Sequence, residues 1–534
     1  MTGASEALQD LQISSSVGAD TMADNEEEEE LARFQPVLDT IRFDHLPDFA
    51  LSLRARSSST ALVTADTDHE PMGIASSCKV VQPPLFGSYH ILYILEFDSG
   101  DRWILRVPVT GHTDSFDEGA ARSLRSEALK MKLISQETSI PIPKVHHFET
   151  SLENEIGCPF ILMDCVEGIN GQASWFDRTI DSSLLEERRA RILRDVANAM
   201  QQLGRFTYQC GGSPTYDDNH NFAGIGPLRV PDHDAELRRM RSDDDDESPL
   251  FCEIGPFFNV EDFLLSSLNR REPCLDDFSL GVRKLLECFI RWLPPDGSAP
   301  PFVLEHPDFD IQNIVVKEDG TLAALIDWDG VASVPRCIGN TKLPSWLTRD
   351  WDPAKYAYGR RLDNGEPTLE DSPADLARYR SMYAKFILET DTQGEGVCNT
   401  GLSLLADNLY IAASDPMCTD GIVDKIFEEC IRARKWRIEK EQPEIQQKPV
   451  DNDHEEDQEA DKSEGREDDR DSDSEDGDDE EDEVFLYELV TELDDGNFNK
   501  MQLAIVKEGF ADLCRELEDL DGEFWFSNDD STTP

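Results

Sequence analysis

Three polar residues crowd into the segment HPDFDIQN at 306–313: His306, Asp308 and Asn313. Soon afterwards the apolar run LAALID ends in a further carboxylate, Asp327. Phosphoryl transfer needs a carboxylate that orients or deprotonates the acceptor hydroxyl, and oxygen ligands that hold Mg²⁺ against nucleotide phosphates. The order of these residues indicates Asp308 for the first role and Asn313 with Asp327 for the second.

A hairpin is expected to bring the two proposed metal ligands together. The short apolar runs NIVV and AALI flank KEDGT, a sequence typical of a tight turn between antiparallel strands. Asn313 opens the first run and Asp327 follows the second. The pattern therefore predicts that the two side chains lie next to each other.

The elements before and after this hairpin differ in kind. HILYILEF and RWILRVPV predict two strands joined by the four-residue loop DSGD, and PFILMDCVEG predicts a further strand. Apolar spacings of three and four residues predict helices over 118–136 and 183–203, with Ser183 and Glu186 as a capping box for the latter. Further helices are expected over 280–293, 374–389, 420–440 and in two terminal segments. The sequence predicts an α+β fold, with a small β-rich lobe followed by a larger, mostly helical one.

The charge of the chain excludes some partners and is concentrated in one place. The formal net charge of the 534 residues is −61, and 21 of the 33 residues from Asp451 to Glu483 are acidic. Such a field repels phosphate backbones and anionic lipid, so we expect neither a nucleic-acid nor a membrane partner. Twelve scattered cysteines without a CxxC pair, and an N-terminus without a secretory pattern, predict a cytoplasmic protein, with the nucleus as the alternative.

The ordered motifs resemble the aminoglycoside phosphotransferase family, in its fungal branch. HPDFDIQN and IDWDG are similar to the catalytic loop and metal-binding strand of that family. The resemblance continues in LFGSYHILYILEFDSGDRWILRVPV, SEALKMKLI, IPIPKVHHF, FILMDCVEG and LTRDWDP, so it spans roughly residues 80–355. It implies a protein-kinase-like two-lobed fold and an ATP- and Mg²⁺-dependent phosphotransferase that acts on a hydroxyl of a small molecule.

The resemblance also implies roles for individual residues. Asp308 would be the catalytic carboxylate, His306 would organise its loop, and Asn313 and Asp327 would bind Mg²⁺. Gly87 and Ser88 would lie over the nucleotide phosphates, and Glu127 would pair with Arg106. The residues expected to face the adenine are Met163, Asp164 and Cys165. The aromatic segment with Trp346, Trp351, Tyr356 and Tyr358 is where we expect the acceptor pocket.

Two departures from the family leave an alternative open. Arg106 stands where many relatives carry lysine, and the phosphate loop has one glycine. Both favour a catalytically silent pseudokinase, a binding module whose acidic tract attracts basic proteins. The Arg106–Glu127 pair has an alternative reading as an ordinary surface ion pair. We expect Asp310 to be a solvated loop acid, and Asp329 either to support the metal site or to cap the next turn.

The composition predicts five segments. We expect a largely disordered extension over 1–75, in which the apolar residues of 31–55 favour a short helix, then the β-rich lobe over 76–168 and the helical lobe over 169–444. An acidic disordered insert follows over 445–483, and residues 484–534 return as helices that pack on the helical lobe. Within the insert, DSDSEDGDDEED departs from a calcium loop because Asp476 stands where glycine is required.

Overall fold

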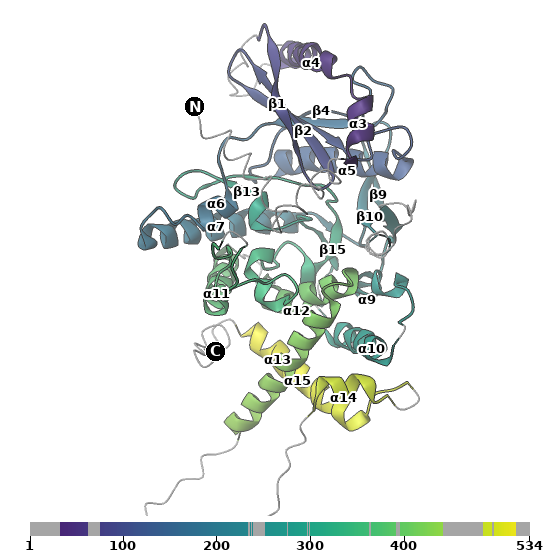
Figure 1. Cartoon of the computed structure of the whole chain (residues 1–534), viewed down its shortest axis with the longest axis vertical. Coiled ribbons are helices and arrows are strands. Elements are labelled where there is room, and N and C mark those ends of the chain that lie inside the picture. The colour runs from purple at the N-terminus through teal and green to yellow at the C-terminus, as the bar shows by residue number, and fades with distance from the viewer. Residues whose placement is uncertain are drawn as a thin grey trace, which may run out of the picture.

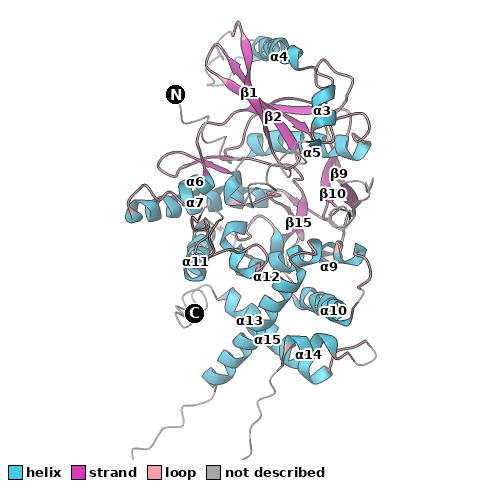
Figure 2. Ribbon diagram, viewed as in Figure 1, coloured by secondary structure: helices cyan, strands magenta, loops and turns pink. Residues whose placement is uncertain are grey.

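The computed structural model describes most of the chain outside the acidic tract. The described residues are 32–61, 75–232, 235, 238, 251–274, 276–295, 297, 299–362, 365–390, 396–441, 484–493 and 496–519. The predicted insert over 445–483, with its calcium-like sequence, lies outside them. The predicted α+β architecture is confirmed: a five-stranded sheet forms one lobe and helices dominate the other (Figures 1 and 2).

The sheet lobe is antiparallel, in the order β1-β2-β3-β5-β4. Its strands are β1 (Cys78–Phe86), β2 (His90–Phe97), β3 (Arg102–Pro108), β4 (Val145–Glu149) and β5 (Phe160–Asp164). Alternate residues of β2 are buried, which is the pattern of a strand with one covered face. The predicted hairpin of β2 and β3 is confirmed, and the predicted helix is α5 (Glu118–Glu137).

Two helices cover this sheet from a segment that was expected to be largely disordered. They are α3 (Gln35–Thr40) and α4 (Leu46–Ala61). Val37, Leu46 and Ala50 are fully buried and share one core with strand residues such as Leu95 and Leu105. The structure thus has two helices where the sequence favours one short helix over 31–55.

The helical lobe contains the long helices that the spacing predicts and one that it does not. Its elements are α6 (Gly171–Trp175), α7 (Ser182–Gln201), α9 (Val260–Leu264), α10 (Asp277–Trp292), α11 (Pro373–Thr390), α12 (Gly396–Ser414) and α13 (Thr419–Glu441). The sequence reading missed α12. The expected capping box at Ser183 is also wrong, because Asp181 caps α7 by accepting a hydrogen bond from the Ser183 N–H.

The chain returns to the helical lobe after the acidic tract. Helix α15 (Lys500–Glu518) lies across α13, and α14 (Leu486–Thr491) packs on α10 (Figure 1). Val506 and Leu513 of α15 are fully buried, and Arg432 and Arg437 of α13 form ion pairs with it. The division of the chain into five segments stays a prediction.

Small hairpins that the sequence reading did not predict connect the two lobes. After α7, β8 (Ser213–Tyr216) pairs with β9 (Phe222–Gly226), and β10 (Leu228–Pro231) pairs with β11 (Phe251–Ile254). Strand β7 (Thr207–Tyr208) lies outside these pairs, because it pairs with β12 (Phe302–Leu304). The β8–β9 pair packs on α5. These hairpins therefore form a wall beside the helix that carries Glu127.

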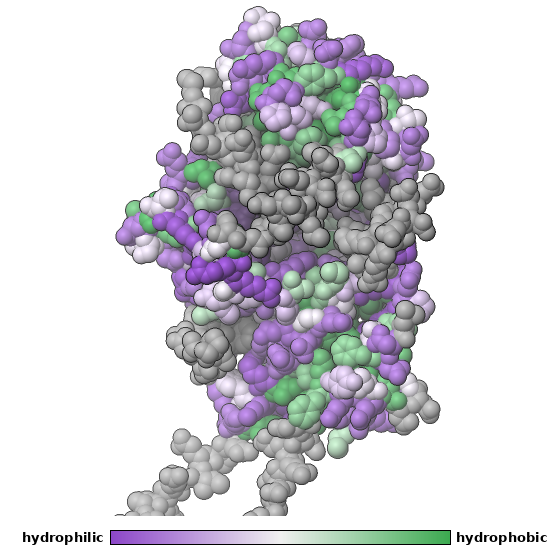
Figure 3. Space-filling view, in the orientation of Figure 1, coloured by the Kyte–Doolittle hydropathy of each residue, from purple (hydrophilic) through white to green (hydrophobic). Residues whose placement is uncertain are grey.

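The outer surface is mixed in character. On the face drawn in Figure 3, apolar residues gather in separate patches over the sheet lobe and over the C-terminal helices, and hydrophilic residues surround each patch. Among the described helices, none combines the length and the apolar character that a membrane crossing requires.

Candidate active site

The predicted hairpin forms, and it brings the proposed metal ligands together. Strands β13 (Ile314–Val316) and β14 (Leu322–Leu325) pair with Ile314 opposite Leu325, and β6 (Ile169–Asn170) extends this sheet. The Ile326 N–H donates to the Asn313 carbonyl at 2.9 Å. Asp327, the next residue, has a φ of 61°, a left-handed conformation that is uncommon outside glycine. The chain turns sharply there and leaves the Asp327 carboxylate at the end of the hairpin.

The loop before this hairpin holds Asp308 and Asn313 against each other. The Asn313 Nδ2 amide donates to Asp308 Oδ2 at 2.8 Å and to the Asp308 carbonyl at 2.9 Å. His306 is 1% exposed, and its Nε2 lies 2.9 Å from the Ile326 carbonyl. His306 thus ties the loop to the strand end from which Asp327 projects.

Burial shifts the pKa values of His306 and Asp308 in opposite directions. It lowers the pKa of His306 to about 4, so the ring is neutral at pH 7 and donates its Nε2–H to the carbonyl. Asp308 is exposed at the surface, but partial loss of solvent around its carboxyl raises the pKa of this group. The hydrogen bond from Asn313 opposes that rise. A raised pKa makes a carboxylate a better proton acceptor.

Arg106 occupies the centre of a cluster on the sheet-lobe side. It forms an ion pair with Glu127 of α5, and its Nη2 donates to Asp327 at 2.7 Å and lies 3.1 Å from His90 Nδ1. The Arg106 and Glu127 side chains are 8% and 3% exposed, so the alternative of a surface ion pair is wrong. Burial opposes the charge of Arg106, but the Glu127 and Asp327 carboxylates raise its pKa above the ordinary value. Arg106 therefore stays cationic and joins both lobes.

The remaining predicted nucleotide contacts lie at the ends of the sheet strands. Gly87 and Ser88 form the turn between β1 and β2, and the Gly87 N–H donates within that turn to the His90 carbonyl at 2.9 Å. Met163 and Asp164 end β5, and Cys165 follows them where the chain leaves the sheet. All three are partly buried, and Asp164 Oδ1 lies 2.6 Å from His146 Nε2.

The oxygen donors present fit Mg²⁺. The two hydrogen bonds of the Asn313 amide nitrogen leave its carbonyl oxygen available, and one Asp327 oxygen remains beyond the Arg106 contact. Mg²⁺ in nucleotide sites commonly uses one or two protein carboxylates and completes its shell with phosphate oxygens and water. Within the described ranges, no group of three or more His, Cys, Asp or Glu side chains forms an all-protein metal cage. The residues present thus suit a metal that a nucleotide helps to hold.

Comparison with known proteins finds a similar family. Residues 92–338 match the family model described as the phosphotransferase enzyme family. Residues 92–338 are therefore similar to that family. The match covers the sheet lobe from β2 onward, the Asp308 loop and the Asp327 hairpin, and the resemblance to aminoglycoside phosphotransferases is confirmed.

The curated relatives are fungal proteins. Altered inheritance of mitochondria protein 9, mitochondrial, of Kluyveromyces lactis is 19% identical over 64% of this chain and 60% of its own length. A subtelomeric hrmA-associated cluster protein of Aspergillus fumigatus is 28% identical over 47% of this chain and 57% of its own. The chain thus spans about 60% of the length of these relatives. Several relatives carry the first of these names, which describes them as mitochondrial, and this finding overturns the prediction of a cytoplasmic location.

A solved structure covers a similar part of the chain. The ternary complex of aminoglycoside phosphotransferase APH(4)-Ia with AMP-PNP and hygromycin B aligns with 69% of this chain and 98% of its own. The sequence identity is 13% and the TM-score is 0.36.

The same segment contains polar residues that the sequence analysis missed or misjudged. His90 contacts Arg106, and burial followed by the Arg106 charge lowers the pKa of His90 well below its ordinary value. Asp310 is not a solvated acid, because Arg349 holds its carboxylate at 3.0 Å. Asp329 lies 3.8 Å from His90 and 4.0 Å from Arg106, at the edge of the cluster. The residues next to His90, Asp310 and Asp329 in the sequence are mostly apolar, so they do not indicate which partners these side chains contact.

A buried lysine fixes α5 to the hairpin wall. Lys130, on the same side of α5 as Glu127 and three residues after it, is 1% exposed and donates to the Tyr208 hydroxyl at 2.6 Å. Its ammonium group also lies over the rings of Tyr216 and Phe222, at 5.9 and 5.3 Å from their centroids. Burial lowers the pKa of Lys130 to about 8. This cage holds the helix that presents Glu127 to Arg106.

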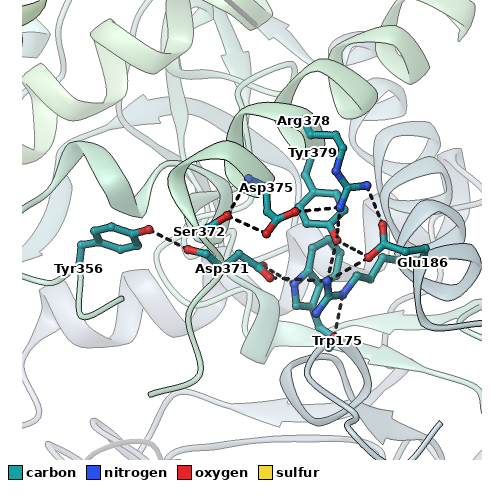
Figure 4. A network of polar contacts seen from close by, with 9 residues as sticks. Trp175, Glu186, Tyr356, Asp371, Ser372, Asp375, Arg378 and Tyr379 are labelled. Atoms are coloured by element: carbon teal, nitrogen blue, oxygen red, sulfur yellow. Dashed lines mark hydrogen bonds and ion pairs between the residues drawn. The ribbon is translucent and has the colours of Figure 1, made fainter. Parts of the chain in front are cut away.

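A second polar network lies under the Asp308 loop. Figure 4 shows the Trp175 indole and the Tyr356 hydroxyl, from separate segments, converging on Asp371. Glu186 of α7 accepts from Tyr379 and Arg378 of α11. The network ties α6, α7 and α11 to the segment around Asp371, and so braces the floor of the site.

The expected acceptor region is only partly accessible. Trp346 and Trp351 are 4% and 2% exposed, so they belong mainly to the core, although Trp346 also lines a small cavity with Ile311 and Arg349. Tyr356 and Tyr358 stack with their ring centroids 6.2 Å apart, and Tyr358 is 52% exposed. Of the predicted aromatic residues, the two tyrosines remain candidates for acceptor contact.

Replacing Arg106 with alanine should affect both stability and nucleotide affinity. The change leaves Glu127 buried without its cation and removes charge-assisted hydrogen bonds, which contribute about 1.5–3 kcal/mol each. We expect a loss of at least that size in urea unfolding, and a smaller thermal shift with Mg·ATP.

Arg102→Ala is the matched control on the same strand. Arg102 pairs with Glu96 near the surface, where an ion pair contributes about 0–1 kcal/mol. Equal effects of the two substitutions would mean that the buried Arg106–Glu127 pair contributes no more to stability or to nucleotide affinity than a surface pair does.

Proposed function

We propose that this protein is an ATP- and Mg²⁺-dependent phosphotransferase that acts on a hydroxyl group of a small molecule. The carrying observation is that Asp308, Asn313 and Asp327 meet at one hairpin and that Arg106 reaches Asp327 from the other lobe. The match of residues 92–338 to the phosphotransferase enzyme family model supports this proposal. The acceptor is proposed only as a class.

In this proposal Asp308 orients the acceptor hydroxyl and takes its proton as the phosphoryl group transfers. The Asn313 amide fixes the Asp308 carboxylate through Oδ2, and neutral His306 holds the loop in register with Asp327. Arg106, clamped by Glu127, offers positive charge to nucleotide phosphates. Asn313 and Asp327 would hold Mg²⁺, which neutralises charge on the phosphates.

A catalytically silent nucleotide-binding module is the second candidate, and two contacts favour it. The Gly87 N–H is used within its own turn and is not free to approach a phosphate. Arg106 is already engaged by Glu127, Asp327 and His90. Recruitment of basic proteins by the acidic tract belongs to this second candidate. By likeness to the relatives named as mitochondrial, we propose a mitochondrial location for either one.

ATP consumption in a library of hydroxyl-bearing metabolites tests the proposal. We expect at least one metabolite to stimulate Mg²⁺-dependent ADP formation by the full chain, and Asp308→Asn to abolish the stimulation. Thermal stabilisation by ATP that needs Mg²⁺, without turnover for any metabolite, would favour the silent module. No effect of Mg·ATP at millimolar concentration would contradict both candidates.

A further inference from the structure

A cavity adjoins the Arg106 cluster on the side of α5. It encloses about 470 Å³, including the open space at its mouth. The turn between β1 and β2, the first half of α5 and the β10–β11 hairpin form its walls. Tyr89, Phe116 and Phe251 supply aromatic surface, while Arg106 and Asp329 form the side next to the candidate active site.

Arg229, from β10, supplies a cation to this cavity. Its guanidinium lies over the Phe251 ring at 4.0 Å from the centroid. Within the described part of the chain, the guanidinium of Arg229 takes part in no ion pair within 4.0 Å and in no hydrogen bond, while its backbone lies opposite Glu253 in the β10–β11 ladder. Asp117, Asp329 and Glu253 act on it only as more distant charges, and burial lowers its pKa. A partly buried guanidinium with unused N–H groups is unfavourable unless water or a ligand satisfies them.

The other arginines at this wall are already satisfied. Arg106 binds Glu127 and Asp327, and Arg122 of α5 binds Glu118 and Glu253 at 3.1 and 2.7 Å. Arg229 is therefore the one among these three whose donors are not used by a carboxylate.

We propose that this cavity binds an anionic group, a phosphate or a carboxylate, with Arg229 as its counter-ion. A guanidinium that stacks on a ring through its face keeps its edge free, and that edge matches two oxygens of a phosphate or carboxylate. The aromatic wall suits an apolar body attached to the anionic group. The group belongs either to the acceptor or to a separate effector. The inference does not depend on phosphoryl transfer, because a silent module would have the same cavity.

Inorganic phosphate is the first probe. The full chain is titrated with phosphate against sodium chloride of equal ionic strength, in the presence of saturating Mg·ADP, and thermal stability is measured. We expect a saturable gain with phosphate for the wild type. Arg229→Gln should weaken it about ten-fold or more, the range for charge-assisted hydrogen bonds.

Two further variants locate the phosphate. Arg122→Gln, on the same helix–hairpin contact but already paired, should bind phosphate as the wild type does. A gain that Arg106→Gln abolishes and Arg229→Gln does not would place the phosphate at the nucleotide site and overturn the proposal. The absence of a phosphate-specific gain in the wild type would also overturn it.

Phosphorylated and carboxylated metabolites then distinguish the two sources of the anion. An acceptor raises ADP formation from ATP, whereas an effector stabilises the chain without being consumed. In both cases the effect should shrink in Arg229→Gln and persist in Arg122→Gln. If metabolites act equally on both variants, the cavity does not bind their anionic groups.

Discussion

Substituting Asp308 with asparagine should lower the rate of phosphoryl transfer by about 10²–10⁴-fold, the usual contribution of a general base. The substitution keeps the shape of the side chain but removes its ability to take a proton. Its remaining oxygen can still accept from Asn313 Nδ2, which donates to Asp308 Oδ2 at 2.8 Å in the wild type. Thermal stability and Mg·ATP binding should therefore stay close to those of the wild type. Single-turnover ADP formation and an Mg·ATP thermal shift measure the two quantities.

Asp327→Ala, in contrast to Asp308→Asn, should weaken the binding of Mg·ATP. Asp327 contacts Arg106 and ends the hairpin that carries Asn313, so its loss should weaken Mg²⁺-dependent nucleotide binding. Glu318→Gln, in the exposed turn of the same hairpin, is the control and should leave both quantities unchanged. If Asp308→Asn and Asp327→Ala weakened nucleotide binding alike, Asp308 would not face the acceptor as proposed.

The candidate site was largely accessible from the sequence because its key contact is local. The alternation of short apolar runs around KEDGT fixes the β13–β14 register, and that register alone carries Asn313 to Asp327. The Asp308–Asn313 contact spans five residues of one loop. Such short-range geometry follows from residue spacing without knowledge of the tertiary packing.

Burial and long-range pairing could not be read in the same way. Arg106 and Glu127 were expected to pair, but their spacing along the chain does not reveal that both are buried beneath the hairpin wall. In the sequence, Lys130 resembles any exposed helix lysine, and only the structure shows its contacts with Tyr208 and Phe222. The short strands β7 to β11 are too brief for a clear alternation, so the wall itself escaped prediction.

Helix α12 shows a different limit. Its sequence GLSLLADNLY is apolar on nearly every side, because neighbouring helices surround it, and periodicity therefore gives no amphipathic signal. Asp407 was the exception that could have marked it. A single acid inside an apolar helix requires a buried partner.

That partner is Lys342, and the resulting triad gives the largest expected effect on stability. Lys342 Nζ lies 3.3 Å from both Glu305 Oε2 and Asp407 Oδ1, and all three residues are less than 10% exposed. Glu305 directly precedes His306, so the triad anchors the Asp308 loop to α12. Lys342→Met should destabilise the protein by about 3–5 kcal/mol, because two buried carboxylates lose their cation.

The loss should depend on pH in a definite direction. Burial raises the pKa of Glu305 to about 7, although Lys342 opposes the rise, so removing Lys342 raises it further. A carboxyl whose folded pKa exceeds the unfolded value binds more protons when folded, and its contribution to stability falls as pH rises between those values. The difference between wild type and Lys342→Met should therefore be larger at pH 8 than at pH 5.5 in urea unfolding.

Lys355→Met is the matched control, since Lys355 also lies between two carboxylates but in solvent. It is 3.8 Å from Asp352 and 3.4 Å from Asp415, and its side chain is 60% exposed. A pair in that setting contributes about 0–1 kcal/mol, so Lys355→Met should unfold nearly as the wild type does at both pH values. If Lys342→Met matched this control, the Glu305–Lys342–Asp407 triad would not anchor the Asp308 loop, and the loop would have to be held by His306 and Asn313 alone.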